Sequence, residues 1–314
     1  MLSKRERLEI VIPVFNEAEC LDELMRRLLA LKASMAEVEI GFAFVNDGST
    51  DATMSKLADY ASRHPFIKVL DFSRNFGHQI AVTAGLDHVD ADYVAIIDAD
   101  LQDPPELIEE MYCKAKTGID IVYGKRMTRK GETWFKKLTA GTFYRFISRM
   151  CDVDIPEDTG DFRLISRRVL NAVKLMREKH RFLRGMMPWV GFTSEPMLYH
   201  RDERHAGETK YPLKKMVKFA LDAIFSFSNT PIRVATYTGV FIVCFGVLSG
   251  VVLLYLRFFT KYSVPGITAA ILTIILLGGM QIIMLGIIGE YIGRIFEESK
   301  NRPLYLLKDT INLN

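Results

Sequence analysis

Two segments near the C-terminus, Thr236–Leu256 and Thr268–Gly289, contain no charged residue. As a helix, each is long enough to cross the hydrocarbon core of a bilayer, which is about 30 Å thick. The alternative is a pair of helices buried in a soluble core, but uncharged runs of about 20 residues are rare there. We therefore predict two transmembrane helices, at 236–256 and 268–289.

The connection between these spans, Arg257–Gly266, is short, so they form a hairpin with both ends on one side of the membrane. The positive-inside rule places those ends in the cytoplasm, because the flanks are richer in lysine and arginine than the connection. We expect a cytoplasmic domain at 1–230, a transmembrane hairpin at 231–292 and a cytoplasmic tail at 293–314. The flanking basic residues are Lys214, Lys215, Lys218 and Arg233 before the hairpin, and Arg294, Lys300 and Arg302 after it.

Charge and cysteine content exclude several classes of protein. The net charge over 314 residues is only +3, so nothing polybasic indicates nucleic-acid binding. The four cysteines form no CxxC motif, which argues against a zinc site or a disulfide framework. Free thiols fit a reducing cytosol. The apolar run near the N-terminus ends at Pro13, too early for a signal peptide, and we predict that it is a strand.

Apolar, β-rich runs alternate with helical patterns over the first part of the chain. This alternation predicts an α/β fold whose mostly parallel sheet is covered by helices on both faces. Asn16 is expected to cap a helix at Glu17–Leu31, and a further helix is expected at Glu106–Lys116. The predicted strands are LEIVIPVF, VEIGFAFVND, IKVLDF, DYVAIID and DIVYGKR.

Polar residues follow each of the five predicted strands, and ligands of such sheets bind beyond the carboxyl ends of the strands. We therefore expect one ligand-binding edge that carries both acids and bases. A dinucleotide-binding domain is excluded, because the first strand runs into PVFNE without a glycine-rich turn. The polar residues at this edge are Asn16 and Glu17, Asp47, Ser73–Asn75, Asp98 and Asp100, and Lys125 and Arg126.

The segment IIDADLQDPPE delivers Asp98 and Asp100 at the end of a buried strand. Residues i and i+2 of a strand share a face, so both carboxylates are expected on one side. A divalent cation explains why such repulsive groups lie so close, since Mg²⁺ is usually held by one or two carboxylates and by substrate phosphate oxygens. A lone DxD is a weak signal, but its place after a buried strand strengthens it.

The motifs VIPVFNE, VNDGSTD, SRNFGHQIAVTAGLDH and DADLQDPPE resemble those of family 2 glycosyltransferases with the GT-A fold. The resemblance is closest to polyisoprenyl-phosphate glycosyltransferases, and within them to bactoprenol glucosyltransferases. It continues through TGDFRLISRRV, RFLRGMMPWVGF, ERHAGETKY and LGIIGEYIGRIFEESKNRPLY, so it covers nearly the whole chain. The family also implies a homo-oligomer, for which a tetramer is the expected form.

The resemblance implies roles for the residues at the ligand edge. Pro13, Glu17 and Asp47 would cradle the base and ribose, and for Asp47 a simple Asp-Gly turn is the less favoured alternative. Asp98 and Asp100 would face the diphosphate and Mg²⁺ or Mn²⁺, with Gln102 nearby. The sites thus implied are nucleotide-sugar binding at Pro13, Glu17, Asp47, Asp98 and Gln102, and metal binding at Asp98 and Asp100.

Asp161 in TGDF matches the residue that the family uses near the sugar, often as a base. A phosphate monoester is mostly ionised at pH 7, because its second pKa is about 6, so a base is not needed. Asp161 could instead orient the acceptor, bind a sugar hydroxyl or serve a structural turn. Asp161 and Asp100 are the expected catalytic residues.

Arg126, Arg204 and Lys210 are candidates to bind the lipid phosphate or the leaving diphosphate, unless they form an ordinary solvated basic face. Segments 132–150 and 211–229 combine apolar stripes with basic residues. Such helices lie in a membrane interface, and core packing is the alternative.

The expected activity is inverting transfer of a hexose, glucose from UDP-glucose, to polyprenyl phosphate at the cytoplasmic membrane of a bacterium. GDP-mannose, a formamido-arabinose donor and an N-acetylhexosamine donor remain alternatives for the sugar. A processive synthase is disfavoured, because the chain has RGMMPW where that class carries QxxRW. A non-catalytic membrane scaffold would be expected to lack the acids that this chain retains.

Overall fold

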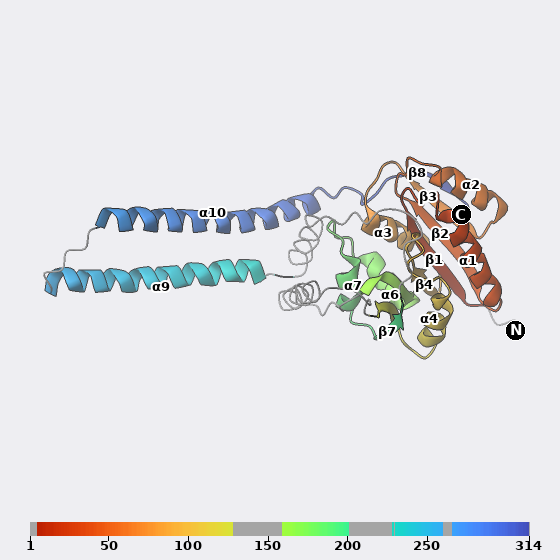
Figure 1. Ribbon diagram of the computed structural model, residues 1–314, viewed down its shortest axis with the longest axis horizontal. Helices are drawn as coiled ribbons and strands as arrows, with labels where there is room; N and C mark the ends of the chain where they lie inside the picture. Colours follow the sequence, from red (N-terminus) through yellow and green to blue (C-terminus); the bar gives the residue numbers. More distant parts are fainter. Residues whose placement is uncertain (1–4, 128–158, 201–227, 229, 260–265, 314) are drawn as a thin grey trace.

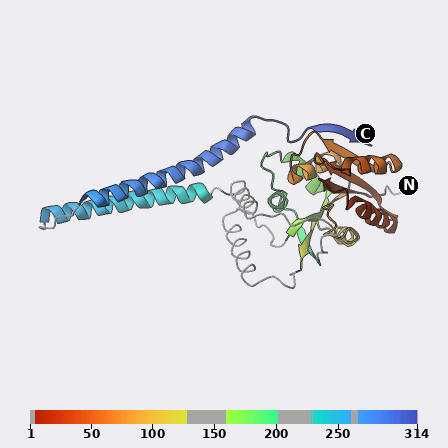
Figure 2. The same cartoon turned by 45° about the horizontal axis from the view of Figure 1, so that its top comes forward.

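An α/β unit carries two long helices that run alongside each other and away from it (Figures 1 and 2). The computed structural model describes residues 5–127, 159–200, 228, 230–259 and 266–313. The unit combines the N-terminal part of the chain with its last residues, so both described ends of the chain lie in it (Figure 1).

The described strands form one sheet in the order β7-β5-β6-β4-β1-β2-β3-β8. Most run in one direction, and β6 and β8 run against their neighbours. The predicted α/β architecture with a mostly parallel sheet is therefore confirmed, and each of the five predicted strands is present. The strands are β1 (Arg7–Val14), β2 (Glu39–Asn46), β3 (Ile67–Phe72), β4 (Tyr93–Ile96), β5 (Ile121–Arg126), β6 (Thr159–Ser166), β7 (Ser194–Tyr199) and β8 (Leu307–Ile311).

Helices cover both faces of this sheet. One apolar core lies against α1 (Leu21–Ser34), α2 (Thr53–Arg63) and α4 (Leu107–Ala115). The opposite face packs against helices that include α3, α6 and α7, through residues such as Val82, Val169 and Met186. Fully buried strands of this kind read as continuous apolar runs, which is why the sequence revealed them. These three helices span His78–His88, Arg167–Leu175 and Leu183–Trp189.

The first helix starts later than predicted. It begins at Leu21, and Asn16 does not cap it. Asn16 instead has a φ of 56° and accepts a hydrogen bond from the backbone of Thr50 at 2.8 Å. The prediction was wrong here because the side chain that could cap a helix ties two loops at the ligand edge together.

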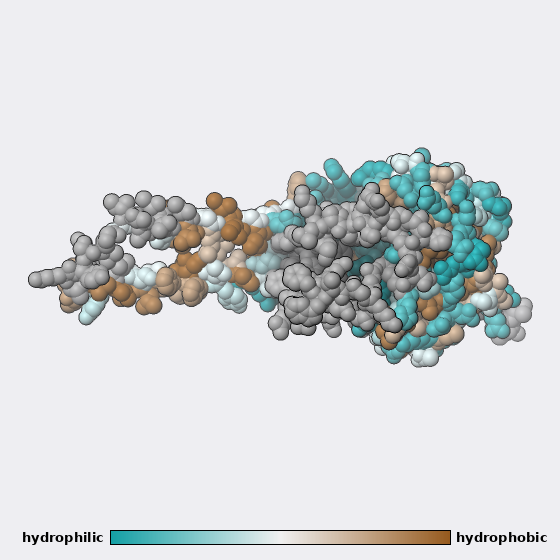
Figure 3. Space-filling model, in the orientation of Figure 1, coloured by the Kyte–Doolittle hydropathy of each residue, from teal (hydrophilic) through white to brown (hydrophobic). Residues whose placement is uncertain are grey.

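The two apolar segments form α9 (Thr230–Phe259) and α10 (Gly266–Ser299). Both are long and apolar enough to cross a membrane. Each extends beyond its predicted span, and their apolar side chains are exposed to the surroundings, as the brown surface in Figure 3 shows. The predicted interfacial segments 132–150 and 211–229, apart from Ser228, lie outside the described residues.

The residues after α10 return to the α/β unit. β8 pairs antiparallel with β3 at the edge of the sheet. Just before β8, the ring of Tyr305 stacks on Phe72 with centroids 5.3 Å apart, and its hydroxyl donates to Asp87 at 3.0 Å. The C-terminal segment therefore covers an edge that would otherwise offer unpaired backbone groups.

Candidate active site

Strand register brings Asp98 and Asp161 to the same place. β6 runs against β4, and the first of its residues that pairs with β4, Arg163, lies opposite Ile96. Asp98 follows the end of β4 by two residues and Asp161 precedes Arg163 by two, and Nε2 of His78 lies within 3.5 Å of both carboxylates. Because β6 is antiparallel to β4, the start of β6 lies at the edge of the sheet where the parallel strands end. Asp161, near the start of β6, therefore lies at this edge.

Four hydrogen-bond contacts surround the buried carboxylate of Asp161, and the buried guanidinium of Arg163 lies 4.0 Å from its Oδ1. Arg184 donates from Nε to Oδ1 at 3.0 Å and from a terminal nitrogen to Oδ2 at 3.3 Å. Gln79 donates to Oδ2 at 3.2 Å, and Nε2 of His78 lies 3.1 Å from the same oxygen. Burial alone would raise the pKa of Asp161, but Arg184 and His78 outweigh it and hold that pKa well below its usual value. Asp161 is thus a fixed anion.

His78, the first residue of α3, links the two carboxylates. Its Nε2 also lies 3.5 Å from Oδ1 of Asp98. Burial disfavours the charged imidazole, yet Asp98 and Asp161 raise the pKa of His78 to about 9. An imidazolium therefore sits between two acids at neutral pH.

The turn after β4 holds Asp98 where its charged form is disfavoured. The same turn holds Leu101 in an unfavourable backbone conformation. Oδ1 of Asp98 is buried and has no hydrogen-bond partner among the described residues. Burial, with help from nearby acids and against His78, raises the pKa of Asp98 to about 6. Leu101 has a φ of 60°, a conformation that costs a non-glycine residue about 1 kcal/mol or more. Such strain often marks a functional turn.

Asp98 and Asp100 do not lie in a strand, so the prediction that strand alternation places them on one side was wrong. β4 ends at Ile96, so both aspartates lie in the turn that follows the strand. Asp100 points one oxygen back at its own turn, where Oδ1 accepts from the backbone of Gln102 at 3.2 Å. The turn, and not strand alternation, therefore sets the direction of the two carboxylates.

Asp47 holds the start of α3. Its Oδ1 accepts from the backbone of Phe76 at 2.6 Å, and its Oδ2 accepts from Gly77 at 3.0 Å. Burial raises the pKa of Asp47, and these hydrogen bonds oppose the rise. The following Gly48 has a φ of 69°, so the Asp-Gly turn is also present. Asp47 therefore positions the helix that presents His78.

Pro13 and Glu17 flank the end of β1. Pro13 is buried within the strand, and Glu17 is partly exposed just beyond it. The backbone N–H of Glu17 donates to Thr53 at 2.9 Å, which ties this loop to the start of α2. Their predicted contact with a nucleotide stays a prediction.

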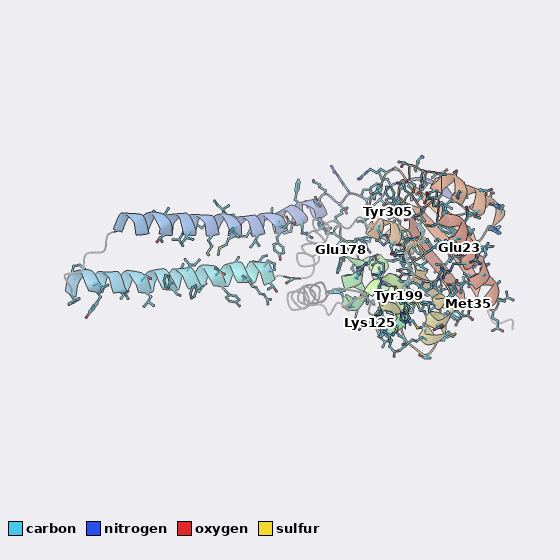
Figure 4. All side chains as sticks on the ribbon, viewed as in Figure 1. Glu23, Met35, Lys125, Glu178, Tyr199 and Tyr305 are labelled. Carbon is cyan, nitrogen blue, oxygen red and sulfur yellow. The ribbon has the colours of Figure 1, made fainter. Side chains whose placement is uncertain are left out.

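A second buried acid secures Arg126 at the same edge. The Tyr199 hydroxyl donates to Oδ1 of Asp103, which is completely buried. Nε of Arg126 donates to that hydroxyl at 3.4 Å. The guanidinium packs closely on Gly160, where a Cβ would come within 2.7 Å of its terminal nitrogen. Figure 4 labels Tyr199 and Lys125 on the neighbouring strands β7 and β5. Arg204 and Lys210 lie outside the described residues.

Sequence reasoning missed the partners of Asp161. His78 and Gln79 lie 83 and 82 residues from it, and Arg184 lies 23 residues away. All three fall within stretches that carry the family resemblance, but nothing in local spacing pairs them with an acid. Only the sheet register and the packing of α3 and α7 bring them together.

The chain is similar to known proteins over nearly its full length. The family model described as glycosyl transferase family 2 matches residues 9–174. An uncharacterized glycosyltransferase of Bacillus subtilis is 47% identical over 312 residues, covering 99% of this chain and 96% of its own. A bactoprenol glucosyl transferase of Shigella phage SfV is 39% identical over 302 residues, covering 96% and 98%. Among solved structures, mannosyl-3-phosphoglycerate synthase from Rubrobacter xylanophilus is 15% identical and covers 83% of this chain and 78% of its own, with a TM-score of 0.46.

Proposed function

The chain belongs to glycosyl transferase family 2 and is a glycosyltransferase, and from this premise we propose that it transfers glucose from UDP-glucose to polyprenyl phosphate. The product would be a lipid-linked sugar for modification of cell-surface glycans. The proposal is supported by the 39% identity to a bactoprenol glucosyl transferase, which extends over 96% of this chain and so includes both apolar helices.

One structural observation carries the proposed chemistry: Asp161 is a buried anion fully engaged by Arg184, Gln79 and His78. A carboxylate whose pKa is held this low is a poor proton acceptor. It suits an acceptor that needs no base, and a phosphate monoester is such an acceptor, because its second pKa is about 6.

The reaction would be a single displacement. An oxygen of the lipid phosphate forms a bond to the anomeric carbon, while the bond to the nucleoside diphosphate breaks and its electron pair leaves with the diphosphate. The configuration at the anomeric carbon is thereby inverted. Asp161 orients the groups around the sugar, and the DxD turn faces the departing diphosphate.

A divalent cation, Mg²⁺ or Mn²⁺, fits the DxD turn. Within the described part of the chain, no group of three or more His, Cys, Asp or Glu side chains forms a metal site by itself. Mg²⁺ commonly uses only one or two carboxylates together with substrate phosphate oxygens. Asp98, whose buried Oδ1 lacks a hydrogen bond, and Asp100 would hold the ion. When bound, it would neutralise charge on the leaving diphosphate.

The remaining predicted residues complete the substrate contacts of the proposal. Pro13, Glu17 and Asp47 would border the nucleoside, and Gln102 would lie near the diphosphate. Arg126 would bind phosphate from the position that Tyr199 and Asp103 give it. Arg204 and Lys210 are proposed phosphate ligands from the sequence alone.

We place α9 and α10 in the bacterial cytoplasmic membrane, with the α/β unit and both termini in the cytoplasm. Their length, apolar composition and exposed apolar side chains support this placement. The acceptor phosphate would then reach the enzyme at the bilayer surface, next to the α/β unit.

The test uses the purified full chain, undecaprenyl phosphate and radiolabelled nucleotide sugars. UDP-glucose, GDP-mannose, a UDP-N-acetylhexosamine and a formamido-arabinose donor are offered separately. We expect lipid-extractable label from UDP-glucose, with inverted configuration at the anomeric carbon. Label from a different donor alone would refute the assigned sugar, and no lipid product from any donor would refute the acceptor.

A further inference from the structure

The last turn of α10 carries two adjacent acids, Glu297 and Glu298, at the end of the helix where they are disfavoured. The helix dipole is negative at its C-terminus, so cations and not anions are stabilised there. This turn contains no basic residue. The position of the two glutamates is therefore explained by what they touch outside the helix.

Both glutamates contact the loop between α6 and α7, residues 176–182. The backbone N–H of Lys179 donates a hydrogen bond to Oε1 of Glu298. Nε2 of the next residue, His180, lies 2.9 Å from Oε2 of Glu297. Glu178 of the same loop is labelled in Figure 4, between the end of α10 and the α/β unit. Glu298 thus holds the loop by a hydrogen bond, and Glu297 lies beside His180 without forming one.

A hydrogen bond within the 176–182 loop joins its two ends, and α7, which carries Arg184, follows it in the chain. Arg181 donates to the carbonyl of Met176, which closes the loop on itself. The first residue of α7, Leu183, donates its backbone N–H to Oε1 of Gln79 at 2.9 Å. Nε2 of the same Gln79 amide donates to Oδ2 of Asp161. The residue after Leu183 is Arg184, which holds the same carboxylate with two hydrogen bonds.

The chain beyond α10 provides a second attachment. β8 pairs with β3, and Asn312 donates to the backbone carbonyls of Ala61 and Ile67 at 2.9 Å each. The end of α10 is therefore attached to the α/β unit on two sides, through the 176–182 loop and through β8.

We propose that Glu298, with Glu297 beside it, is a positioning residue for the transfer reaction. It fixes the 176–182 loop and thereby sets Arg184 and Gln79 against Asp161. The inference rests on the proposed function, because a helix in the membrane would then also fix the height of Asp161 above the bilayer. A misplacement of about 1 Å in such an assembly can lower the rate about 100-fold.

The experiment compares three variants of the full chain in lipid nanodiscs. Glu298→Ala removes the oxygen that accepts from Lys179, and Glu298→Gln keeps an acceptor oxygen there. Glu290→Gln is the matched control, since Glu290 lies on the same helix and pairs only with Arg294, at 3.2 Å, among the contacts that the structure gives for its side chain. Transfer kinetics are measured together with hydrogen exchange of the amides of residues 176–190.

We expect Glu298→Ala to lower kcat for lipid transfer by roughly 10-fold or more, with the donor KM unchanged. The amide of Leu183 should exchange faster in this variant, while the amides of α4 should not change. Glu298→Gln and Glu290→Gln should behave like the wild type in both measurements.

Unchanged exchange at Leu183 in Glu298→Ala would overturn the proposal, and so would faster exchange with an unchanged kcat. An equal loss in Glu298→Gln would show that the acceptor oxygen is not the cause, which also contradicts it. If the wild type transfers nothing to the lipid, the proposed function fails, and the exchange of Leu183 still decides whether Glu298 holds the loop.

Discussion

The guanidinium of Arg184 lies against the carboxylate of Asp161, with Nε 3.0 Å from Oδ1 and a terminal nitrogen 3.3 Å from Oδ2. This pair joins α7 to the first residues of β6. Together with His78, it holds the pKa of Asp161 well below its usual value and keeps the carboxylate charged.

The first prediction concerns the stability of this pair. Arg184→Ala should destabilise the protein by about 3–5 kcal/mol, because it leaves the buried carboxylate of Asp161 without its main counterion. Arg63→Ala is the matched control, since both side chains of its ion pair with Asp59 are exposed and the loss of such a pair should cost ~0–1 kcal/mol. Urea unfolding of the full chain in detergent measures both. Equal costs for the two variants would contradict the role of Arg184.

The second prediction concerns the pH dependence of Asp161. The folded pKa of Asp161 is depressed, so the group is ionised throughout the window from about pH 5.5 to 8 that brackets the phosphate pKa. The defect of Asp161→Asn in single-turnover transfer, at saturating donor, should therefore be nearly flat with pH. A wild-type advantage that shrinks steadily as pH rises would identify Asp161 as a general base and refute the positioning role.

The third prediction concerns the metal. Asp100→Ala should abolish transfer and nucleotide-dependent Mn²⁺ binding while the circular dichroism spectrum stays that of the wild type. EDTA should likewise stop the wild-type reaction, and added Mg²⁺ or Mn²⁺ should restore it. Full activity of the variant, or of the wild type in EDTA, would exclude a metal at the DxD turn.

The fourth prediction concerns membrane topology. In a cysteine-free background, a membrane-impermeant thiol reagent added outside the cell should label Ser263→Cys but not Ser299→Cys. The reason is the excess of lysine and arginine on both flanks of the hairpin. Labelling of Ser299→Cys from outside would reverse the proposed orientation.

The five strands β1 to β5 were predictable because strands buried on both faces appear as continuous apolar runs, whereas β6 and β7 were not predicted. β8 was not predicted either, because Leu307–Ile311 is short, mostly exposed and lies at an edge, where its sequence resembles a polar tail. The start of the first helix was missed because Asn16 has two possible uses, and the loop around Thr50 takes the side chain.

The acids of the site could be anticipated, but the groups that set their charge could not. Asp98 and Asp100 follow a strand with a distinctive composition, and Asp161 lies in a family motif. His78 and Arg184 act on Asp161 from two different helices, and long-range packing determines that contact. A single sequence does not encode such pairs in its local spacing.

The most direct test of the account is a single-turnover reaction of the full chain with radiolabelled UDP-glucose and undecaprenyl phosphate, analysed by lipid extraction and NMR of the product. The account predicts one labelled product, glucose joined to the lipid phosphate with inverted configuration, formed by the wild type and not by Asp100→Ala. Free glucose as the sole labelled product, or a lipid product with retained configuration, would contradict it.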